Sequence, residues 1–264
     1  MEILGYLSAL IIGFCLSLIG GGGSILTVPV LVYVMGINPI LATAYSLFIV
    51  GLAALVGSIN RMKKGEVSFK TAIVFAIPSF VAVYLTRLLI VPAIPDVVFS
   101  NTLFLLTKEV FIMLLFALIM LAAAVSMIRS GMKKEENLKQ KKTFNYPIVM
   151  LDGLVVGALT GLVGAGGGFL IIPALVLLVR MPMKTAVGTS LLIIAIKSLI
   201  GFIGDIQSGQ LIDWKLLCIF SAFTIAGIFM GSFVSNFFSG KKLKTTFGWF
   251  VLVMGIYIII KELV

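Results

Sequence analysis

The chain has 264 residues, of which 61% are hydrophobic and only 11% charged, and its mean hydropathy is +1.22. Soluble domains are usually about 45–50% apolar and about 25% charged, so this composition excludes a soluble fold and predicts an all-α, multi-pass protein of the cell (inner) membrane. The net charge of +10 comes mainly from short loops between apolar runs, so we interpret it as membrane topology rather than as a nucleic-acid surface.

Several kinds of chemistry are missing from the sequence. It contains no histidine, and its two cysteines, Cys15 and Cys218, lie inside apolar runs, where we expect them to pack as small apolar side chains. We therefore expect no enzymatic activity, no metal site and no cofactor. The first residues, MEILGYLSAL, lack a basic region, which favours a retained membrane segment over a cleaved signal peptide.

Apolar runs predict ten membrane segments, five on each side of a polar stretch. In the first half the runs cover 3–19, 24–36, 39–59, 67–91 and 103–128. In the second half they cover 147–163, 168–180, 184–204, 215–238 and 244–260. The polar stretch 129–146, RSGMKKEENLKQKKTFNY, is interpreted as a basic cytoplasmic linker between a first repeat over 1–128 and a second repeat over 147–264.

The second segment of each half is short. Its 13 residues make about 20 Å of helix, against a hydrocarbon core of about 30 Å. Each short segment follows a glycine cluster, at 20–23 in the first half and at 164–168 in the second. We therefore expect discontinuous or re-entrant helices, because irregular backbone persists inside a membrane only where protein or a wet cavity surrounds it.

The two halves repeat each other. A shift of 144 residues aligns them without a gap from Leu18/Leu162 to Thr71/Lys215. An ungapped match of this length indicates an internal duplication. The identical pairs include Gly20/Gly164, Gly22/Gly166, Gly23/Gly167, Pro29/Pro173, Ser46/Ser190, Gly57/Gly201 and Gly65/Gly209.

Aligned loops of the two halves differ in charge. After the third segment the first half reads NRMKKGEVSFK, with four basic residues, whereas the second half reads GDIQSGQLIDWK, with Asp205 and Asp213 and a single lysine. By the positive-inside rule the first loop is cytoplasmic and the second is external. We therefore predict that the two repeats have inverted topology.

Inverted repeats are typical of secondary transporters, which bind their substrate near the middle of the membrane between the repeats. Proteins of other classes stay open as alternatives: a duplicated scaffold without transport, a passive anion channel, and a membrane enzyme or assembly subunit. A metal or cation carrier is disfavoured, because no cluster of acidic, Cys or His ligands lies within the segments.

The doubled motif is similar to that of a known family. GGGGSILTVP (20–29) with ATAYSL (42–47), and GAGGGFLIIP (164–173) with AVGTSL (186–191), resemble the signatures of the sulfite exporter TauE/SafE family over nearly the whole chain. Ala165 replaces one glycine of the pattern. The resemblance implies a permease for small sulfur-containing oxyanions such as sulfite or organosulfonates. A carrier for another small organic or inorganic anion stays the alternative, since substrates vary within the family.

The glycine clusters are candidate anion-binding elements. A helix that starts after a glycine turn presents unpaired N–H groups and the positive end of its dipole. We expect the starts of 24–36 and 168–180 to face each other near mid-membrane. The residues predicted to contact the anion there are Gly21, Gly22, Gly23, Ser24, Gly166, Gly167 and Gly168. The alternative is that the glycines only allow close helix packing.

Polar side chains of the third segments complete the predicted site. Lys197 is the most informative, because a cation in mid-membrane costs about 2.5–3.5 kcal/mol and usually marks a ligand path. The rival interpretation is that Lys197 extends to the external interface. Four hydroxyl groups can either donate to an oxyanion or bond back to their own helix, and they belong to Thr43, Ser46, Thr189 and Ser190.

Arg87, Glu109 and Asp152 are further ionisable residues inside the predicted segments. Either carboxyl group could carry a coupling proton, and either could instead anchor its helix at the interface. The expected partners are the lipid bilayer, a small anionic substrate and a coupling proton or cation. A homodimer stays open.

Overall fold

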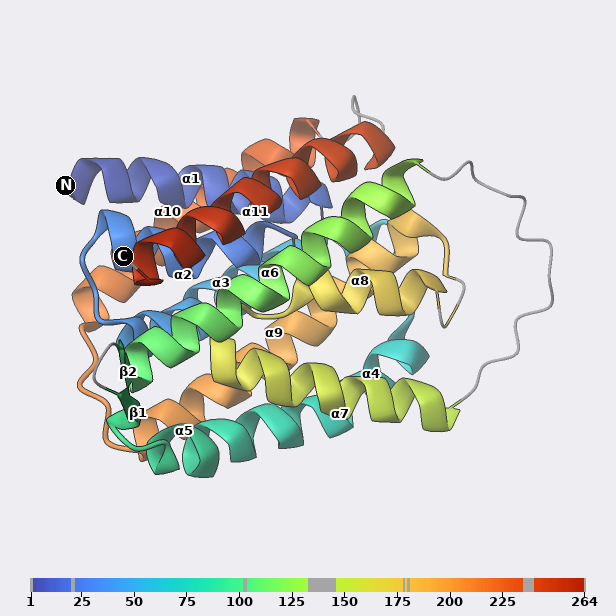
Figure 1. Cartoon of the computed structure of the whole chain (residues 1–264). Coiled ribbons are helices and arrows are strands. Elements are labelled where there is room, and N and C mark those ends of the chain that lie inside the picture. Colours follow the sequence, from blue (N-terminus) through green and yellow to red (C-terminus); the bar gives the residue numbers. More distant parts are fainter. Residues whose placement is uncertain are drawn as a thin grey trace.

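The computed structural model describes residues 2–19, 22–101, 104–132, 146–177, 179, 181–234 and 240–263, and it is a bundle of long helices (Figure 1). The first half begins with α1 (Glu2–Ile19) and a broken helix made of η1 (Gly22–Leu26), α2 (Thr27–Pro29) and η2 (Val30–Val34). These are followed by α3 (Pro39–Lys63) and by a long helix made of α4 (Phe69–Leu85), η3 (Thr86–Ile90) and α5 (Val91–Ala93). Strands β1 (Val97–Asn101) and β2 (Phe104–Thr107) and helix α6 (Lys108–Met132) complete this half. The second half consists of α7 (Tyr146–Val163), α8 (Gly168–Leu177), α9 (Met183–Gln207), α10 (Trp214–Val234) and α11 (Gly240–Leu263).

Five helices of the described residues are long and apolar enough to cross a membrane: Pro39–Lys63, Phe69–Ala93, Lys108–Ser126, Lys184–Gln207 and Trp214–Val234. Shorter apolar helices cover Leu4–Leu18, Gly23–Val34 and Pro147–Val163. Each of the ten predicted segments corresponds to a helix or a broken helix, which confirms the prediction of a helical, polytopic membrane protein. Most of the predicted linker, 133–145, lies outside the described residues.

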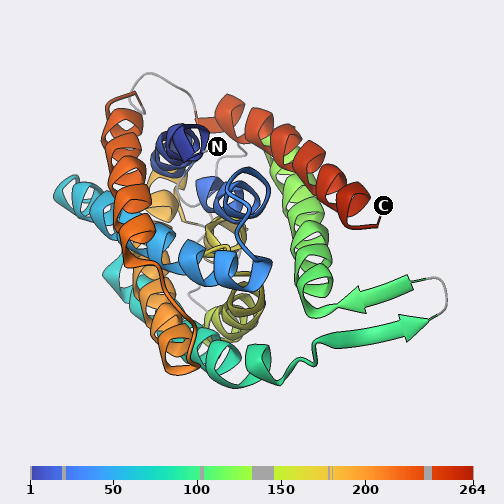
Figure 2. The same cartoon turned by 90° about the vertical axis from the view of Figure 1, so that its left-hand side faces the viewer.

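A two-stranded hairpin is the one element that the sequence analysis did not predict. Strands β1 and β2 are antiparallel, with Val97 opposite Thr107 and Asn101 opposite Phe104. Figure 2 shows the hairpin projecting away from the helices. The membrane segment predicted from residue 103 therefore begins later, at Lys108, because the apolar run FLLT belongs to β2.

The helices of the two halves exchange partners. Helix α1 packs against α10, and its counterpart α7 packs against α4, the counterpart of α10. The two third helices, α3 and α9, pack against each other, and so do the two fifth helices, α6 and α11. Aligned glycines make two of these contacts close: a Cβ atom on Gly13 would overlap the carbonyl oxygen of Thr224, and one on Gly157 would overlap that of Ser79.

Helices α3 and α9 run antiparallel. The amide of Ser68, which follows α3, donates to Thr189 near the start of α9, at 3.0 Å. The amide of Asp213, which follows α9, donates to the hydroxyl of Tyr45 near the start of α3, at 2.6 Å. The loops after α3 and after α9 therefore lie at opposite ends of the pair. Opposite ends are what inverted repeats require, and the inversion within a membrane stays a prediction.

Both third helices end in the same way. Gly65 and Gly209, which the repeat aligns, have φ angles of +68° and +83°. Beyond them, the amide of Glu66 donates to the carbonyl of Arg61 at 3.0 Å, and the amide of Gln210 donates to that of Asp205 at 3.3 Å. These bonds form the helix stop in which a left-handed glycine lets the last carbonyls be satisfied. The stop fixes where the charged residues at the ends of α3 and α9 lie.

Candidate functional site

A tight glycine turn precedes α8 inside the bundle. Gly164, Gly166 and Gly167 have φ angles of +71°, +64° and +69°, a conformation that side-chain-bearing residues rarely adopt. All residues from 164 to 168 are buried. Helix α7 thus ends and α8 begins within the protein interior, as expected for a discontinuous membrane helix.

The turn places backbone amides at the start of α8. Gly164 N–H donates to Thr160 O at 2.8 Å, and the amides of Ala165, Gly166, Gly167 and Gly168 follow in the turn. These amides lie at the N-terminal end of α8, where the helix dipole is positive. Backbone N–H groups at a helix start are groups that bind anions in proteins.

Close neighbours of the turn come from both halves of the chain. A Cβ atom on Gly166 would lie 3.5 Å from the Cβ of Ser24, and one on Gly167 would lie 2.6 Å from Lys197 Nζ. A Cβ atom on Gly164 would overlap Thr43. The structure therefore brings Ser24, Thr43 and Lys197 around the turn, so these predicted residues share one region with Gly166, Gly167 and Gly168.

Lys197 is completely buried on α9. Its Nζ atom donates to the hydroxyl of Thr160 at 2.8 Å, and no carboxylate of the described residues lies within ion-pair distance. The rival interpretation, in which Lys197 extends to the interface, is wrong for this structure because the side chain reaches no surface. An ammonium group has three donors, so it retains donors for a ligand.

Thr160 was missed by the sequence analysis. It lies near the end of α7, and its hydroxyl also donates to the carbonyl of Gly157 at 3.2 Å. A single threonine in an apolar helix carries no special signal, since its hydroxyl normally bonds to its own backbone. Only the folded structure, which brings the Thr160 hydroxyl within 2.8 Å of Lys197 Nζ, shows that Thr160 accepts this bond.

A second charged group lies next to the turn. Arg87 is fully buried in η3 and donates through Nη1 to Thr43 Oγ1 at 2.9 Å and to Asp205 Oδ1 at 3.3 Å. The sequence analysis placed Asp205 in an external loop, and this is wrong: Asp205 belongs to the last turn of α9 and is 2% exposed. The external-loop prediction therefore depends on Asp213, which is exposed and accepts a bond from the amide of Leu216 at 3.0 Å.

Other residues predicted to bind the anion lie far from Lys197 or make contacts typical of helix packing. Thr189 accepts its bond near the opposite end of α9, eight residues or about 12 Å from Lys197. Ser190 donates to the carbonyl of Val187 at 2.8 Å. A Cβ atom on Gly23 would overlap the backbone of α1, so this glycine permits close packing. Gly22 begins η1, and Gly21 lies outside the described residues.

Ser46 is different from these residues. Its side chain is completely buried, and its Oγ atom has no hydrogen-bond partner among the described residues. The same is true of Thr27 Oγ1 in the broken helix of the first half. Buried hydroxyls without partners are costly, so both are available to water or a ligand that reaches them.

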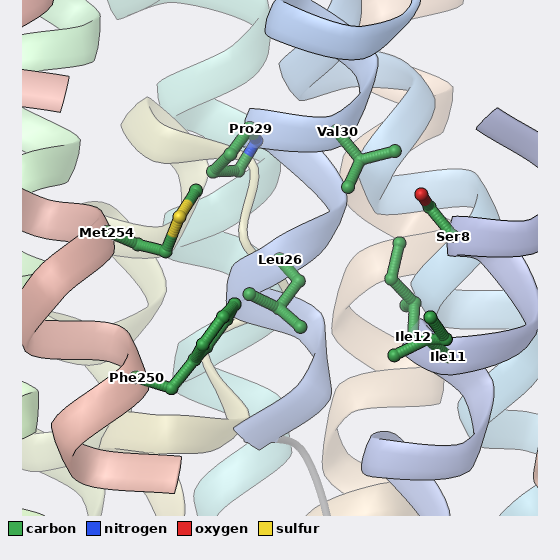
Figure 3. Close-up of a pocket in the computed structure, with 8 residues that line it drawn as sticks. All are labelled: Ser8, Ile11, Ile12, Leu26, Pro29, Val30, Phe250 and Met254. Carbon is green, nitrogen blue, oxygen red and sulfur yellow. The ribbon is translucent and has the colours of Figure 1, made fainter. Parts of the chain in front are cut away.

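The structure also contains a cavity of about 160 Å³ beside the broken helix of the first half (Figure 3). Its lining is almost wholly apolar and consists of Ser8, Ile11, Ile12, Leu26, Pro29, Val30, Phe250 and Met254. The one hydroxyl, on Ser8, donates to the carbonyl of Leu4 at 2.8 Å. None of the predicted binding residues lines this cavity, and an apolar wall does not match a small anion.

A polytopic helical bundle with broken helices and a buried lysine, which has no carboxylate partner among the described residues, is typical of membrane transport proteins. Residues 6–258 match the family described as sulfite exporter TauE/SafE, and the chain belongs to this family. No solved structure matches the chain.

Similar proteins carry names of the same kind. A "Probable membrane transporter protein" of Xylella fastidiosa (strain 9a5c) is 32% identical over 254 residues, which cover 94% of this chain and 91% of that protein. The "Probable membrane transporter protein YunE" of Bacillus subtilis is 29% identical over 78% of both chains. A third, from Methanocaldococcus jannaschii, is 26% identical over 95% of this chain and 92% of its own. The family and these relatives are thus described as membrane transporters.

Proposed function

We propose that this protein is a secondary transporter that carries a small sulfur-containing oxyanion, such as sulfite or an organosulfonate, by alternating access between its two repeats. The observation that carries this proposal is the position of Lys197 Nζ, which is buried against Gly167 near the start of α8 and has no carboxylate partner in the part of the chain that the structure describes. The family description supports the substrate class.

The electrostatics of this region favour an anion. The start of a helix carries the equivalent of about +0.5 charge, and Lys197 adds a full charge beside it. A membrane-embedded cation costs about 2.5–3.5 kcal/mol, and Lys197 has no described carboxylate to offset that cost, whereas Arg87 has Asp205. A bound oxyanion would pair with the Lys197 ammonium and with backbone amides at the start of α8 together.

The arrangement of the helices supports alternating access. Helices α3 and α9 pack against each other between the exchanged pairs α1 with α10 and α7 with α4. Lys197 and the glycine turn lie along this central pair, where inverted-repeat transporters hold their substrates. Because Lys197 has no exposed surface, no open aqueous path reaches it in this conformation, which favours a carrier over a passive channel. An ion or substrate gradient would drive the cycle.

A ligand screen followed by a flux assay tests the proposal. Sulfite, thiosulfate, sulfate and methanesulfonate are added to the purified protein, and the unfolding temperature is measured, since a ligand that binds only the native state raises it. The best ligand is then loaded into proteoliposomes for counterflow of labelled substrate. We expect one sulfur oxyanion to stabilise the protein and to drive saturable counterflow. Stabilisation by none of these anions, or flux without counterflow, would contradict the proposal.

A further inference from the structure

One edge of the Arg87 guanidinium group makes no hydrogen bond to a described residue. Both bonds of its guanidinium group, to Thr43 and to Asp205, come from Nη1. Its Nε and Nη2 atoms are buried and have no partner among the described residues, and neither does the Oδ2 atom of Asp205. This leaves several donors of a fully buried cation unused, within a helix that is long enough to cross the membrane.

The Nε and Nη2 atoms of Arg87 lie on the same edge of the guanidinium group. The N–H groups of Nε and of the Nη atom beside it point in parallel, and this edge binds two oxygens of one oxyanion at once. Asp205 does not occupy that edge, and its contact of 3.3 Å is longer than the usual range of about 2.7–2.9 Å for such bonds. At the other end of α3, by contrast, Arg61 Nη1 lies 2.7 Å from Glu66.

The local backbone is consistent with a functional role. Arg87 belongs to a π-helical turn, Thr86–Ile90, that interrupts the helix between α4 and α5. Single π-helical turns occur frequently at functional sites because they reorient the side chains that they carry. Thr43 accepts from Arg87 while donating to the carbonyl of Ile40 at 2.7 Å. Thr43 is thus a positioning residue for Arg87, and its own proton is not available to a ligand.

The glycine turn connects Arg87 with Lys197. Gly164, at the beginning of the turn, packs against Thr43, and Gly167, three residues later, packs against Lys197. On α9, Asp205 follows Lys197 by eight residues, or about 12 Å. An anion that leaves Lys197 toward the end of the bundle with Asp213 therefore finds Arg87 as the next cation of the described residues.

We propose that the Nε and Nη2 edge of Arg87 is a second binding position for the transported oxyanion, and that the carboxylate of Asp205 competes with the anion for Arg87. This inference rests on the proposed function. The edge suits ligands with two oxygens side by side, namely sulfonates, sulfite and carboxylates, and not halides. The nearby carboxylate keeps the anion from binding too tightly, so that the ligand can leave this position during the transport cycle.

Binding of methanesulfonate and of chloride to the purified full chain tests this inference by calorimetry. Asp205→Asn removes the competing charge while keeping a hydrogen-bond acceptor, and we expect it to tighten methanesulfonate binding at least threefold. Arg87→Lys keeps the charge but loses the paired donors, and we expect at least tenfold weaker methanesulfonate binding with unchanged chloride binding. Glu66→Gln, in the ion pair with Arg61, is the matched control and should change neither affinity.

The inference is overturned if Asp205→Asn leaves methanesulfonate binding unchanged or weakens it. Should Arg87→Lys fail to fold, the Asp205→Asn result still decides the outcome. The double variant Lys197→Met/Asp205→Asn separates the two proposals. A gain from Asp205→Asn that persists without Lys197 supports the Arg87 position on its own. Loss of all transport in Lys197→Met, with no gain from Asp205→Asn, supports the proposed function and overturns this inference.

Discussion

Lys197 on α9 and Thr160 on α7 form a buried hydrogen bond of 2.8 Å that joins α9 to the helix ending at the glycine turn. The bond holds the ammonium group against Gly167, where the amides of α8 begin. It connects residues 37 positions apart in the sequence.

Replacing Thr160 by valine, which has nearly the same shape, removes this acceptor. A buried donor that loses its partner costs about 1–3 kcal/mol, so we expect Thr160→Val to lower the free energy of unfolding by that amount and to reduce transport. Thr224→Val is the control, because the Thr224 hydroxyl is equally buried and donates only to the carbonyl of Phe220 in its own helix. Equal loss of transport in both variants would argue against a special role of Thr160.

Gly167→Ala should disturb the Lys197 site, whereas an equally left-handed glycine elsewhere should not. A left-handed alanine costs about 1–2 kcal/mol wherever it occurs. At Gly167 the new Cβ would also lie 2.6 Å from Lys197 Nζ and displace the ammonium group. Gly209→Ala carries the same backbone strain, at a φ of +83°, and meets no atom within 4 Å. Because the Cβ at Gly167 would also overlap Thr160 Cγ2, we expect Gly167→Ala to lose more stability in thermal unfolding than Gly209→Ala, and only Gly167→Ala to lose transport; parallel losses of transport would place the turn outside the site.

The contact between Arg87 and Asp205 predicts that the stability losses of variants at these two positions do not add. Removing one partner of a buried ion pair costs about 3–5 kcal/mol, whereas replacing both by apolar residues is often neutral. We therefore expect Arg87→Met to unfold at a clearly lower temperature, and Arg87→Met/Asp205→Leu to regain much of the lost stability. Unfolding temperatures of Arg87→Met, of Asp205→Leu and of the double variant measure the coupling between the two residues. Simple addition of the two single effects would show that the contact of 3.3 Å contributes little.

The inverted topology predicts opposite sides for two aligned turns. With Cys15 and Cys218 replaced by serine, a single cysteine is introduced at Lys64 or at Gln210, both in loops after third helices. A membrane-impermeant thiol reagent applied to right-side-out vesicles should label Gln210→Cys and leave Lys64→Cys unlabelled, because the basic loop is expected in the cytoplasm. Labelling of both cysteines from one side would refute the inverted repeats.

The sequence allowed the helices and the glycine breaks to be predicted because both depend on local composition. Ten apolar runs correspond to the helices of the structure, and the glycine cluster at 164–168 is a turn with three left-handed residues. Lys197 was recognisable as a buried cation because no acidic neighbour accompanies it in the sequence.

Contacts between distant segments could not be predicted in the same way. Asp205 lies in a polar stretch typical of a loop, and its partner Arg87 is 118 residues away. The hairpin was hidden because β2 continues into the apolar run of α6. The repeat aligned Ser46 with Ser190, yet Ser46 has no described partner while Ser190 bonds to its own helix. Sequence symmetry does not fix which side-chain contacts form.

Transport by Lys197→Met is the most direct test of the account, because the anion-binding role of this buried cation is its central claim. The measurement is uptake of labelled sulfite into proteoliposomes, with Lys215→Met, an exposed lysine at the start of α10, as the matched control. We predict that Lys197→Met loses at least 90% of uptake, while Lys215→Met transports normally. A tenfold lower uptake rate corresponds to an activation free energy of transport that is higher by about 1.4 kcal/mol. Full uptake with an unchanged KM in Lys197→Met would contradict the account.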